Sequence, residues 1–551
     1  MRVDLFWLDP VASAPPVWSL GQTVKVGTRP HEIAEALSVH EPGADYLLFW
    51  DSSLGAPDEE AVAALTGSSG DVWHAGLALG MAGLPHMIDF VDPVWRFNRD
   101  PDLQIVATSW RLTLRACLVR AAVLERLGGP DPHFETLAGA SLELGHRWIR
   151  GGALMRHVAT LIAPGGWAMD SPVLPLIDEV RFIRTRYGRM WLAWACWRHW
   201  RRGGGLMETI HAYRRRSAPA ASMPVGFVHD PAPSLLAAEP DSTPSVSLLI
   251  PTVDRYPYLF NLLAQLREQT MPPLEIIVVD QTQAGDTVPD WASNFADLPL
   301  RVIQLDTAGQ CSSRNAGLAA ARGDLILFLD DDDEIEPDLI ARHLSLMGRL
   351  DIDASCGVAE EVGMGALPPS FGLIRESDVF PTNNTLLRAA ALRVSGLFDL
   401  AYDKGERADH DLGMRLYLSG AHLVLNPAAS VIHLHAPRGG LRQHGARVVT
   451  RSSSKASILG RQFLAPTEGY LWYRYFNARQ VHEALLIRTL STLRGTHTGV
   501  RRSARMMAMI LLLPFTWRKN SANLRIGREK LVDYPDIPMF EPVSTGEIAA
   551  L

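Results

Sequence analysis

The chain has 551 residues, enough for more than one domain, and its composition is that of an ordinary globular protein. Its formal net charge of -7 argues against wholesale binding to nucleic acid. The four cysteines show no CxxC spacing, which predicts neither a zinc site nor a disulfide framework and fits a reducing cytoplasm. The first residues lack a signal-peptide pattern, and no apolar run has the length of a membrane span.

Composition and patterning divide the chain into four expected parts. Residues 1–170 mix short apolar runs with helical patterns, and residues 171–244 form an aromatic and basic helical segment with a proline-rich linker. Residues 245–445 alternate predicted strands and helices, and residues 446–551 are mostly helical in pattern.

Two segments leave a choice between the protein interior and a membrane surface. Trp191, Trp194 and Trp197 recur at helical spacing and share one helix face. This favours a packed helix with a solvated basic face, and the alternative is a helix resting on an anionic membrane. The apolar run 506–515, flanked by basic residues, is equally consistent with an interfacial helix and with a helix packed on the preceding domain.

Residues 245–329 have the alternation of a parallel α/β sheet. Apolar runs at 246–250, 275–279, 300–305 and 325–329 predict buried strands. Helical patterns at 259–266 and 312–321 lie between them, and this rhythm indicates right-handed βαβ units.

Acidic residues follow three of these strands, at Asp254, at Asp280 and in the run 330–334. In open α/β sheets ligands bind at the carboxyl ends of the strands, so these residues should share one edge. Close carboxylates repel unless a cation lies among them, which predicts a Mg²⁺ or Mn²⁺ site in the run; the alternative is a solvated acidic loop that caps the next helix. Asp254 and Asp280 can accept hydrogen bonds from ribose or base, and Arg314 and Asn315 can meet phosphate or sugar.

A set of segments resembles the family 2 glycosyltransferases, which have the GT-A fold. They lie, in order, at residues 246–252, 275–280, 313–317, 330–333, 383–388, 396–399 and 409–415. The resemblance implies an α/β domain with a mostly parallel sheet flanked by helices. It also implies transfer of a sugar, with inversion, from a nucleotide-sugar donor to a hydroxyl acceptor in cell-surface polysaccharide or glycolipid biosynthesis.

The resemblance implies roles for individual residues. Asp332 would bind Mn²⁺ or Mg²⁺ on the diphosphate, with Asp330 on the metal or the ribose. His435 would be a third ligand, and a structural histidine pair is the alternative. Asp409 would be the general base, and Asp411 stays open because Ala408 stands where the family usually has Glu; a helix cap is the other reading of either aspartate. Residues expected around the donor are Pro251, Asp254, Asp280, Arg314, Asn315, Asp330, Asp331, Arg438 and Arg442.

Residues 1–170 repeat part of the same pattern. The paired segments are 44–53 with 323–332, 112–129 with 387–396, 142–147 with 410–415 and 161–166 with 434–440. Ser53, Ser141 and Ile162 stand where the second copy has its metal ligands and base. This predicts a smaller, degenerate GT-A-like domain without transfer activity, and chance similarity between α/β patterns is the alternative.

Two other functions stay open. A sugar nucleotidyltransferase would want a glycine-rich, basic loop after the first strand, and residues 251–254 are not one. A non-catalytic glycan-binding or scaffold protein would not need the intact acidic set. The expected partners are a nucleotide-sugar donor, a glycan, glycolipid or other hydroxyl acceptor and a membrane surface, without nucleic acid. We expect the protein in the cytoplasm, and the alternative is peripheral attachment to the inner face of the cell membrane.

Overall fold

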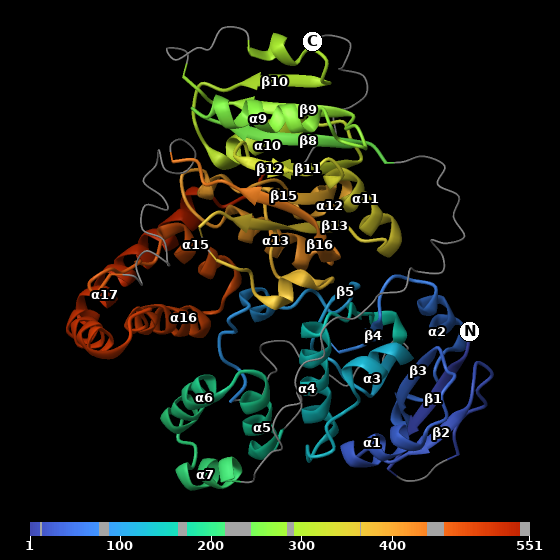
Figure 1. Cartoon of the computed structure of the whole chain (residues 1–551). Coiled ribbons are helices and arrows are strands. Elements are labelled where there is room, and N and C mark those ends of the chain that lie inside the picture. The colour runs from blue at the N-terminus through green and yellow to red at the C-terminus, as the bar shows by residue number, and fades with distance from the viewer. Residues whose placement is uncertain are drawn as a thin grey trace.

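The structure is a computed structural model that describes residues 1–10, 14–76, 87–162, 174–214, 244–283, 291–363, 365–437 and 457–539. Two β-sheets organise the structure, one in the blue-to-teal part of the ribbon and one in the green-to-orange part (Figure 1). Helices from the end of the chain, drawn in red, flank the second sheet. Most of the expected linker, residues 215–243, lies outside the described residues.

The first sheet has seven strands in the order β2-β1-β3-β6-β4-β7-β5. The central strand β3 is buried on both sides, because Leu47 and Phe49 join one core and Leu48 and Trp50 the other. The strands are β1 (Val3–Leu8), β2 (Thr23–Val26), β3 (Tyr46–Asp51), β4 (Val72–His74), β5 (Ala107–Thr108), β6 (Ala116–Arg120) and β7 (Met155–His157). The helices are α1 (Pro30–Val39), α2 (Glu59–Thr66), α3 (Ala121–Leu127) and α4 (Leu137–Arg150).

The second sheet has nine strands in the order β10-β9-β8-β11-β15-β13-β16-β12, with β14 paired to β16. The strands are β8 (Val246–Thr252), β9 (Glu275–Asp280), β10 (Leu300–Gln304), β11 (Leu325–Leu329), β12 (Asp333–Ile335), β13 (Ala354–Glu361), β14 (Arg375–Glu376), β15 (Asn384–Arg388) and β16 (Leu423–His433). The helices are α9 (Tyr256–Leu266), α10 (Gln310–Ala320), α11 (Leu339–Leu350), α12 (Ala389–Ser395) and α13 (Ala408–Leu418). The four strands and two helices predicted between residues 245 and 329 are confirmed.

The second sheet is mixed rather than mostly parallel. Parallel pairing joins β10, β9, β8 and β11 in turn, and joins β13 to β16. β15 enters between β11 and β13 and is antiparallel to both, and β12 and β14 are antiparallel to β16. The βαβ rhythm therefore sets the sheet only as far as β11, beyond which the chain returns in the opposite direction.

Seven strands of the second sheet repeat the topology of the first. β9-β8-β11-β15-β13-β16-β14 follow the same spatial order as β2-β1-β3-β6-β4-β7-β5, and each set runs through the chain in the same sequence. The directions of neighbouring strands also agree. Taken in this spatial order, the first two pairings of each set are parallel, the next two are antiparallel, the fifth is parallel and the sixth is antiparallel. Tyr46 pairs with Arg120 as Leu325 pairs with Arg388, so the registers of the two central pairs correspond.

The same side-chain contact joins two helices in each domain. In α4, Arg147 pairs with Glu143 one turn earlier and donates to a backbone carbonyl in the last turn of α3. In α13, Arg415 pairs with Asp411 one turn earlier and donates to a carbonyl in the last turn of α12. Each domain thus uses an arginine, held by its own acidic partner, to satisfy carbonyls at a helix end.

A buried polar seam joins the two domains. Glu376 in β14 is buried and accepts hydrogen bonds from the Thr108 hydroxyl at 2.9 Å and from the Met155 backbone at 3.0 Å. Arg156 donates to Thr108 and to the carbonyl of Gly420. Because an unsatisfied buried charge is costly, this network fixes how the two edges meet.

The aromatic and basic segment packs against the end of the chain. Its helices are α5 (Leu176–Arg186), α6 (Arg189–Arg201) and α7 (Leu206–Arg214). Trp191 stacks on Phe90 with ring centroids 4.7 Å apart, and Trp194 donates to Glu483 at 2.7 Å. Trp191 and Trp194 are packed, as the first interpretation predicted, whereas Trp197 is 37% exposed.

The C-terminal part is helical, as predicted. It contains α15 (Pro466–Tyr475), α16 (Ala478–Leu490) and α17 (Gly499–Asp533), which continues through Pro514. Asn520 of α17 is fully buried, accepting from the Leu464 backbone and donating to Thr489. Among the helices in the described ranges, none is both long enough and apolar enough to cross a bilayer.

A buried histidine makes the stability of the second sheet depend on pH. Burial lowers the pKa of His343 to about 4, while its ring bonds Ser355 and Asn384. The unfolded chain binds a proton near pH 6.5, so the stabilisation is complete above that pH and declines as the pH falls towards 4. Relative to His343→Gln, the wild type should lose about 1.4 kcal/mol of unfolding free energy per pH unit in this window. Urea denaturation at several pH values measures this, and parallel pH profiles would contradict it.

Candidate functional site

The acidic run lies where β11 ends and the chain turns into β12. β12 pairs antiparallel with the end of β16, which places Asp333 opposite His433. The backbone N–H of Asp330 donates to the Asp333 carboxylate at 2.9 Å, and His433 Nδ1 lies 2.9 Å from Asp333 Oδ1. Strand pairing therefore assembles this site from residues about a hundred positions apart in sequence.

Asp330, Asp332 and His433 each offer a ligand atom to one point, and these atoms lie within 4.8 Å of one another. Two carboxylate oxygens and an imidazole nitrogen suit Mn²⁺ and, less well, Mg²⁺. The second oxygen of Asp332 accepts from the Ala436 backbone at 2.7 Å, which fixes the orientation of that carboxylate. The residues present therefore fit a divalent cation.

The structure brings His433, and not His435, to the carboxylates. A strand would put both rings on one face, but β16 ends at His433 and His435 has a left-handed backbone with φ of 57°. The turn directs His435 towards Glu361, with which it forms an ion pair. The two rings still pack edge to face, with their centroids 4.5 Å apart, so His435 helps to hold the ring of His433 in place.

The charge balance of the site favours a cation. Burial alone would lower the pKa of His433, but its hydrogen bond to Asp333 and the nearby carboxylates raise that pKa to about 9. A protonated imidazole thus offsets part of the negative charge. A metal ion at the same point would replace the proton, because metal and proton compete for the ring nitrogen.

Arg255 is a site residue that the sequence analysis missed. Its guanidinium lies 3.0 Å from Asp331 and 3.2 Å from Asp332. The preceding residue, Asp254, has φ of 55°, and this left-handed turn directs Arg255 back to the acidic run. The signal in the sequence was an arginine directly after a strand-end aspartate. Asp254 itself is exposed at the sheet edge.

Two residues predicted to contact the nucleotide-sugar donor, Asp331 and Asp280, are held in place by hydrogen bonds within the protein. Asp331 is buried and accepts from the Thr252 hydroxyl at 2.8 Å as well as from Arg255, so it faces the interior. Asp280 is also buried and accepts from the Tyr256 hydroxyl at 2.8 Å. Pro251 lies near the end of β8 and is half-buried.

Arg314 and Asn315 have different surroundings. Arg314 lies 2.7 Å from Asp330 and so joins α10 to the candidate metal site. Asn315 uses both ends of its amide on the backbone of Phe398, at 2.8 and 2.9 Å. It therefore holds the 396–399 segment against α10, and a contact with the donor stays a prediction. Arg438 and Arg442 lie outside the described residues.

The two candidate bases differ in exposure. Asp411 is fully buried, pairs with Arg415 at 2.8 Å and accepts from the Tyr475 hydroxyl at 2.7 Å. Its burial and its two partners give it a structural role, and its action as the base stays a prediction. The Asp409 side chain is 32% exposed in the first turn of α13 and lies 3.0 Å from the neighbouring His410.

The matching position in the first sheet carries an internal ion pair. Asp51 ends β3 as Asp330 follows β11, and its carboxylate accepts from Arg115 at 2.6 Å and from the Ser53 hydroxyl at 2.6 Å. Ser141, opposite Asp409 in the paired segments, is buried and accepts from the Leu114 backbone. An arginine thus supplies the positive charge that a metal would supply in the second sheet.

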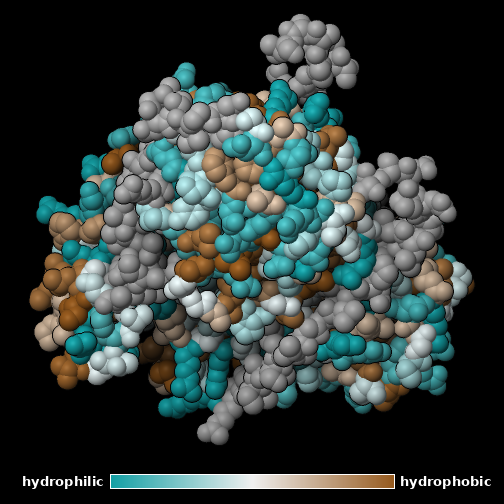
Figure 2. All heavy atoms as spheres, turned by 45° about the horizontal axis from the view of Figure 1, so that its top comes forward, coloured by the Kyte–Doolittle hydropathy of each residue, from teal (hydrophilic) through white to brown (hydrophobic). Residues whose placement is uncertain are grey.

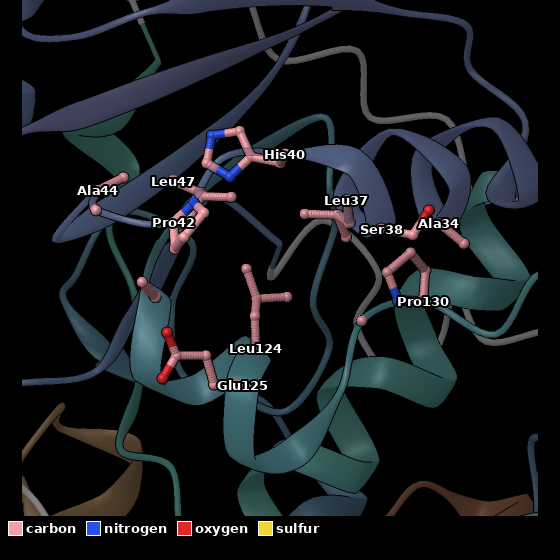
Figure 3. A pocket seen from close by; sticks show the side chains of 13 residues that line it. Ala34, Leu37, Ser38, His40, Pro42, Ala44, Leu47, Leu124, Glu125 and Pro130 are labelled. Atoms are coloured by element: carbon pink, nitrogen blue, oxygen red, sulfur yellow. The ribbon is translucent and has the colours of Figure 1, made fainter.

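A cavity of about 420 Å³ lies in the first domain, away from these strand ends. It opens between α1, α3 and the start of β3 (Figure 3). Leu37, Leu47 and Leu124 line it, with Glu125 as its one carboxylate. It lies at the opposite edge of the sheet from Asp51, and its lining does not provide the oxygen ligands of a metal site.

The glycosyl transferase family 2 model matches residues 247–385. EpsH of Bacillus subtilis, provisionally named a glycosyltransferase, is 42% identical over 108 residues, 19% of this chain and 31% of that protein. TarS of Staphylococcus aureus, a poly(ribitol-phosphate) β-N-acetylglucosaminyltransferase, is 33% identical over 98 residues, 17% of each chain. The matches thus span about a third or less of these relatives. Residues 247–385 are therefore similar to the family 2 glycosyltransferases.

A solved structure of residues 1–349 of S. aureus TarS with UDP-GlcNAc is similar over 54% of this chain and all of that chain. The identity is 16% and the TM-score 0.35.

Substitutions should separate the structural aspartate from the accessible one. Asp411→Ala leaves Arg415 buried without its partner, and the loss of unfolding free energy should be about 3–5 kcal/mol. Asp409→Ala removes a part-exposed group and should change it by less than about 0.5 kcal/mol. Urea denaturation followed by tryptophan fluorescence measures both. Equal losses would contradict the assignment of the two roles.

Proposed function

We propose that residues 245–437 form the catalytic GT-A domain of an inverting, divalent-metal-dependent glycosyltransferase with a nucleotide-sugar donor and a hydroxyl acceptor. The observation that carries the proposal is the convergence of Asp330, Asp332 and His433 at the end of β11, inside the matched family segment. The strand order beyond β11, with β15 antiparallel to its neighbours, is consistent with that fold.

In this proposal Asp330, Asp332 and His433 hold Mn²⁺ or Mg²⁺. When bound, such an ion neutralises charge that develops on the departing nucleoside diphosphate. Arg314 and Arg255 hold the carboxylates of Asp330 and Asp332 in place, so the ligand oxygens are preorganised. Asp254, exposed at the same edge, and Asp280 with Tyr256 would border the nucleoside.

Asp409 would accept the proton of the acceptor hydroxyl. It is the accessible carboxylate of the two considered, and His410 at 3.0 Å can orient it. In-line attack assisted by a single base inverts the anomeric centre, whereas retention by double displacement needs a second carboxylate as nucleophile.

The curated relatives support a role in polysaccharide synthesis. ExoO of Rhizobium meliloti, a succinoglycan biosynthesis protein, is 32% identical over 105 residues. TarS, by its name, adds N-acetylglucosamine to poly(ribitol-phosphate). We infer a cell-surface glycan or its precursor as the acceptor class. Offering UDP-, GDP- and dTDP-sugars with Mn²⁺ and following donor hydrolysis identifies the donor, and transfer from that donor to such a glycan tests the acceptor class.

Removing the metal should abolish donor turnover. EDTA should stop hydrolysis of the accepted donor, and Mn²⁺ should restore it. Asp332→Asn should lower the rate by at least about 10² while the fold persists, because the departing diphosphate loses its counter-charge. Circular dichroism checks the fold. Turnover that survives EDTA, or a fully active variant, would refute the metal role.

Asp409→Asn tests the base. The substitution keeps size and removes the proton acceptor, so transfer should slow by about 10²–10⁴. The affinity for the donor, measured by calorimetry with the nucleoside diphosphate and Mn²⁺, should stay the same. His410→Gln is the matched neighbour and should have a smaller effect on rate. Normal transfer by Asp409→Asn would exclude it as the base.

We also propose that residues 1–162 are a degenerate copy of the catalytic domain without transfer activity. The shared strand order, the paired Arg147 and Arg415 contacts and the Asp51–Arg115 ion pair support this. An arginine already neutralises the one carboxylate in the metal position, and a serine without a partner base is a poor proton acceptor.

Matched substitutions in the two copies distinguish them. Asp51→Asn together with Ser141→Ala should leave the transfer rate within about twofold, because these residues touch no reacting atom. The equivalent pair, Asp330→Asn with Asp409→Asn, should abolish it. The measurement is the initial rate with one donor and a small acceptor. A large loss from the first pair would place chemistry in the first domain.

A further inference from the structure

The helix α17 exposes a continuous apolar strip near its middle. Met507, Ile510, Leu511 and Phe515 have exposed fractions of 65, 53, 76 and 54%. Their spacing of three, one and four residues places them on one side of the helix, with Pro514 between them. Figure 2 shows apolar surface at the left edge of the molecule, on the side where α17 lies in Figure 1.

The opposite side of α17 is anchored to the protein. Arg505, Met509, Thr516 and Asn520 are buried, and the Arg505 guanidinium donates to backbone carbonyls at Ser457 and elsewhere. The helix is therefore fixed in orientation, and its apolar strip is held outward by the packing of the other face. A surface of this kind on a fixed helix marks a site of contact.

Basic residues surround the strip at both ends. Helix α17 contains eight arginines and lysines against two acidic residues, although the whole chain has a net charge of -7. Arg501 and Arg502 precede the strip, and Arg518, Arg525 and Arg528 follow it, all exposed. Arg518 and Arg525 follow Leu511 by seven and fourteen residues and so continue the same side of the helix.

We infer that α17 docks the protein on an anionic lipid membrane. Apolar side chains entering the boundary between head groups and acyl chains, with arginines beside the phosphates, are the features of a helix lying in the membrane surface. The helix is 35 residues long, yet the strip is confined to its middle, which suits lying along a surface rather than crossing it. The inference is independent of the proposed activity.

Flotation of the whole chain with lipid vesicles tests the inference. The protein should float with phosphatidylcholine vesicles that contain phosphatidylglycerol and remain below with phosphatidylcholine alone. Met507→Asp with Leu511→Asp should reduce the bound fraction by at least about tenfold, because two charges would enter the apolar layer. Val17→Asp with Val394→Asp makes the same charge change at two exposed valines elsewhere and should float like the wild type.

A second variant tests the contribution of the arginines to membrane binding. Arg518→Glu with Arg525→Glu should reduce binding to the anionic vesicles by about tenfold or more, and added salt should do the same for the wild type. Unchanged flotation of the Met507 and Leu511 variant, or equal binding to both kinds of vesicle, would overturn the inference. Concentration-dependent dimers that this variant abolishes, without vesicle binding by the wild type, would overturn it in favour of a second copy.

Discussion

The electrostatic balance at the end of β11 is the constraint on which the rest of the catalytic domain depends. Asp331, Asp332 and Asp333 are consecutive and almost fully buried, an arrangement that is costly unless cations face it. Arg255 and His433 supply two positive charges from other segments. Both depend on backbone features, since Arg255 follows a left-handed turn and His433 is placed by the pairing of β12 with β16.

The first domain shows what the same topology does without that cluster. Its strand β3 ends in one aspartate, Asp51. The Asp51 carboxylate pairs with Arg115 and accepts a hydrogen bond from Ser53, so its charge is balanced within the first domain. The sheet order, the helix that follows β6 and the arginine in α4 have counterparts in the second domain, where they also support the packing of the sheet and its helices. The two domains meet at corresponding edges, with Thr108 in β5 of one bonded to Glu376 in β14 of the other, so the first sheet also supports the second.

Much of this architecture could be predicted from local patterns. The largely apolar runs 246–250, 275–279 and 325–329 located three strands, which end at Thr252, Asp280 and Leu329, within two residues of the end of each run. The antiparallel half of the sheet could not be predicted this way, because the pairing of β15 between β11 and β13 is long-range. The helix pattern of the tail was also readable, whereas the exposure of its apolar side depends on which face meets α15 and α16.

The site residues also divide into those that local sequence predicts and those that depend on long-range contacts. Asp330 and Asp332 could be assigned from a short motif, because a strand end fixes their position. The choice between His433 and His435 depended on a single backbone turn, and the difference between Asp409 and Asp411 on the burial of Asp411 beside Arg415. The only sequence signal for Arg255 was its place directly after a strand-end aspartate, and its role appears only when β8 and β11 lie side by side.

The most direct test of the central claim is a crystal of the whole chain grown with Mn²⁺ and a nucleoside diphosphate, examined by anomalous diffraction. The account predicts one strong manganese peak between the carboxylates of Asp330 and Asp332 and the ring of His433, with ligand distances near ~2.2 Å. The diphosphate should lie on the far side of that ion. A peak beside Asp51, or a diphosphate bound with no metal at the end of β11, would contradict it.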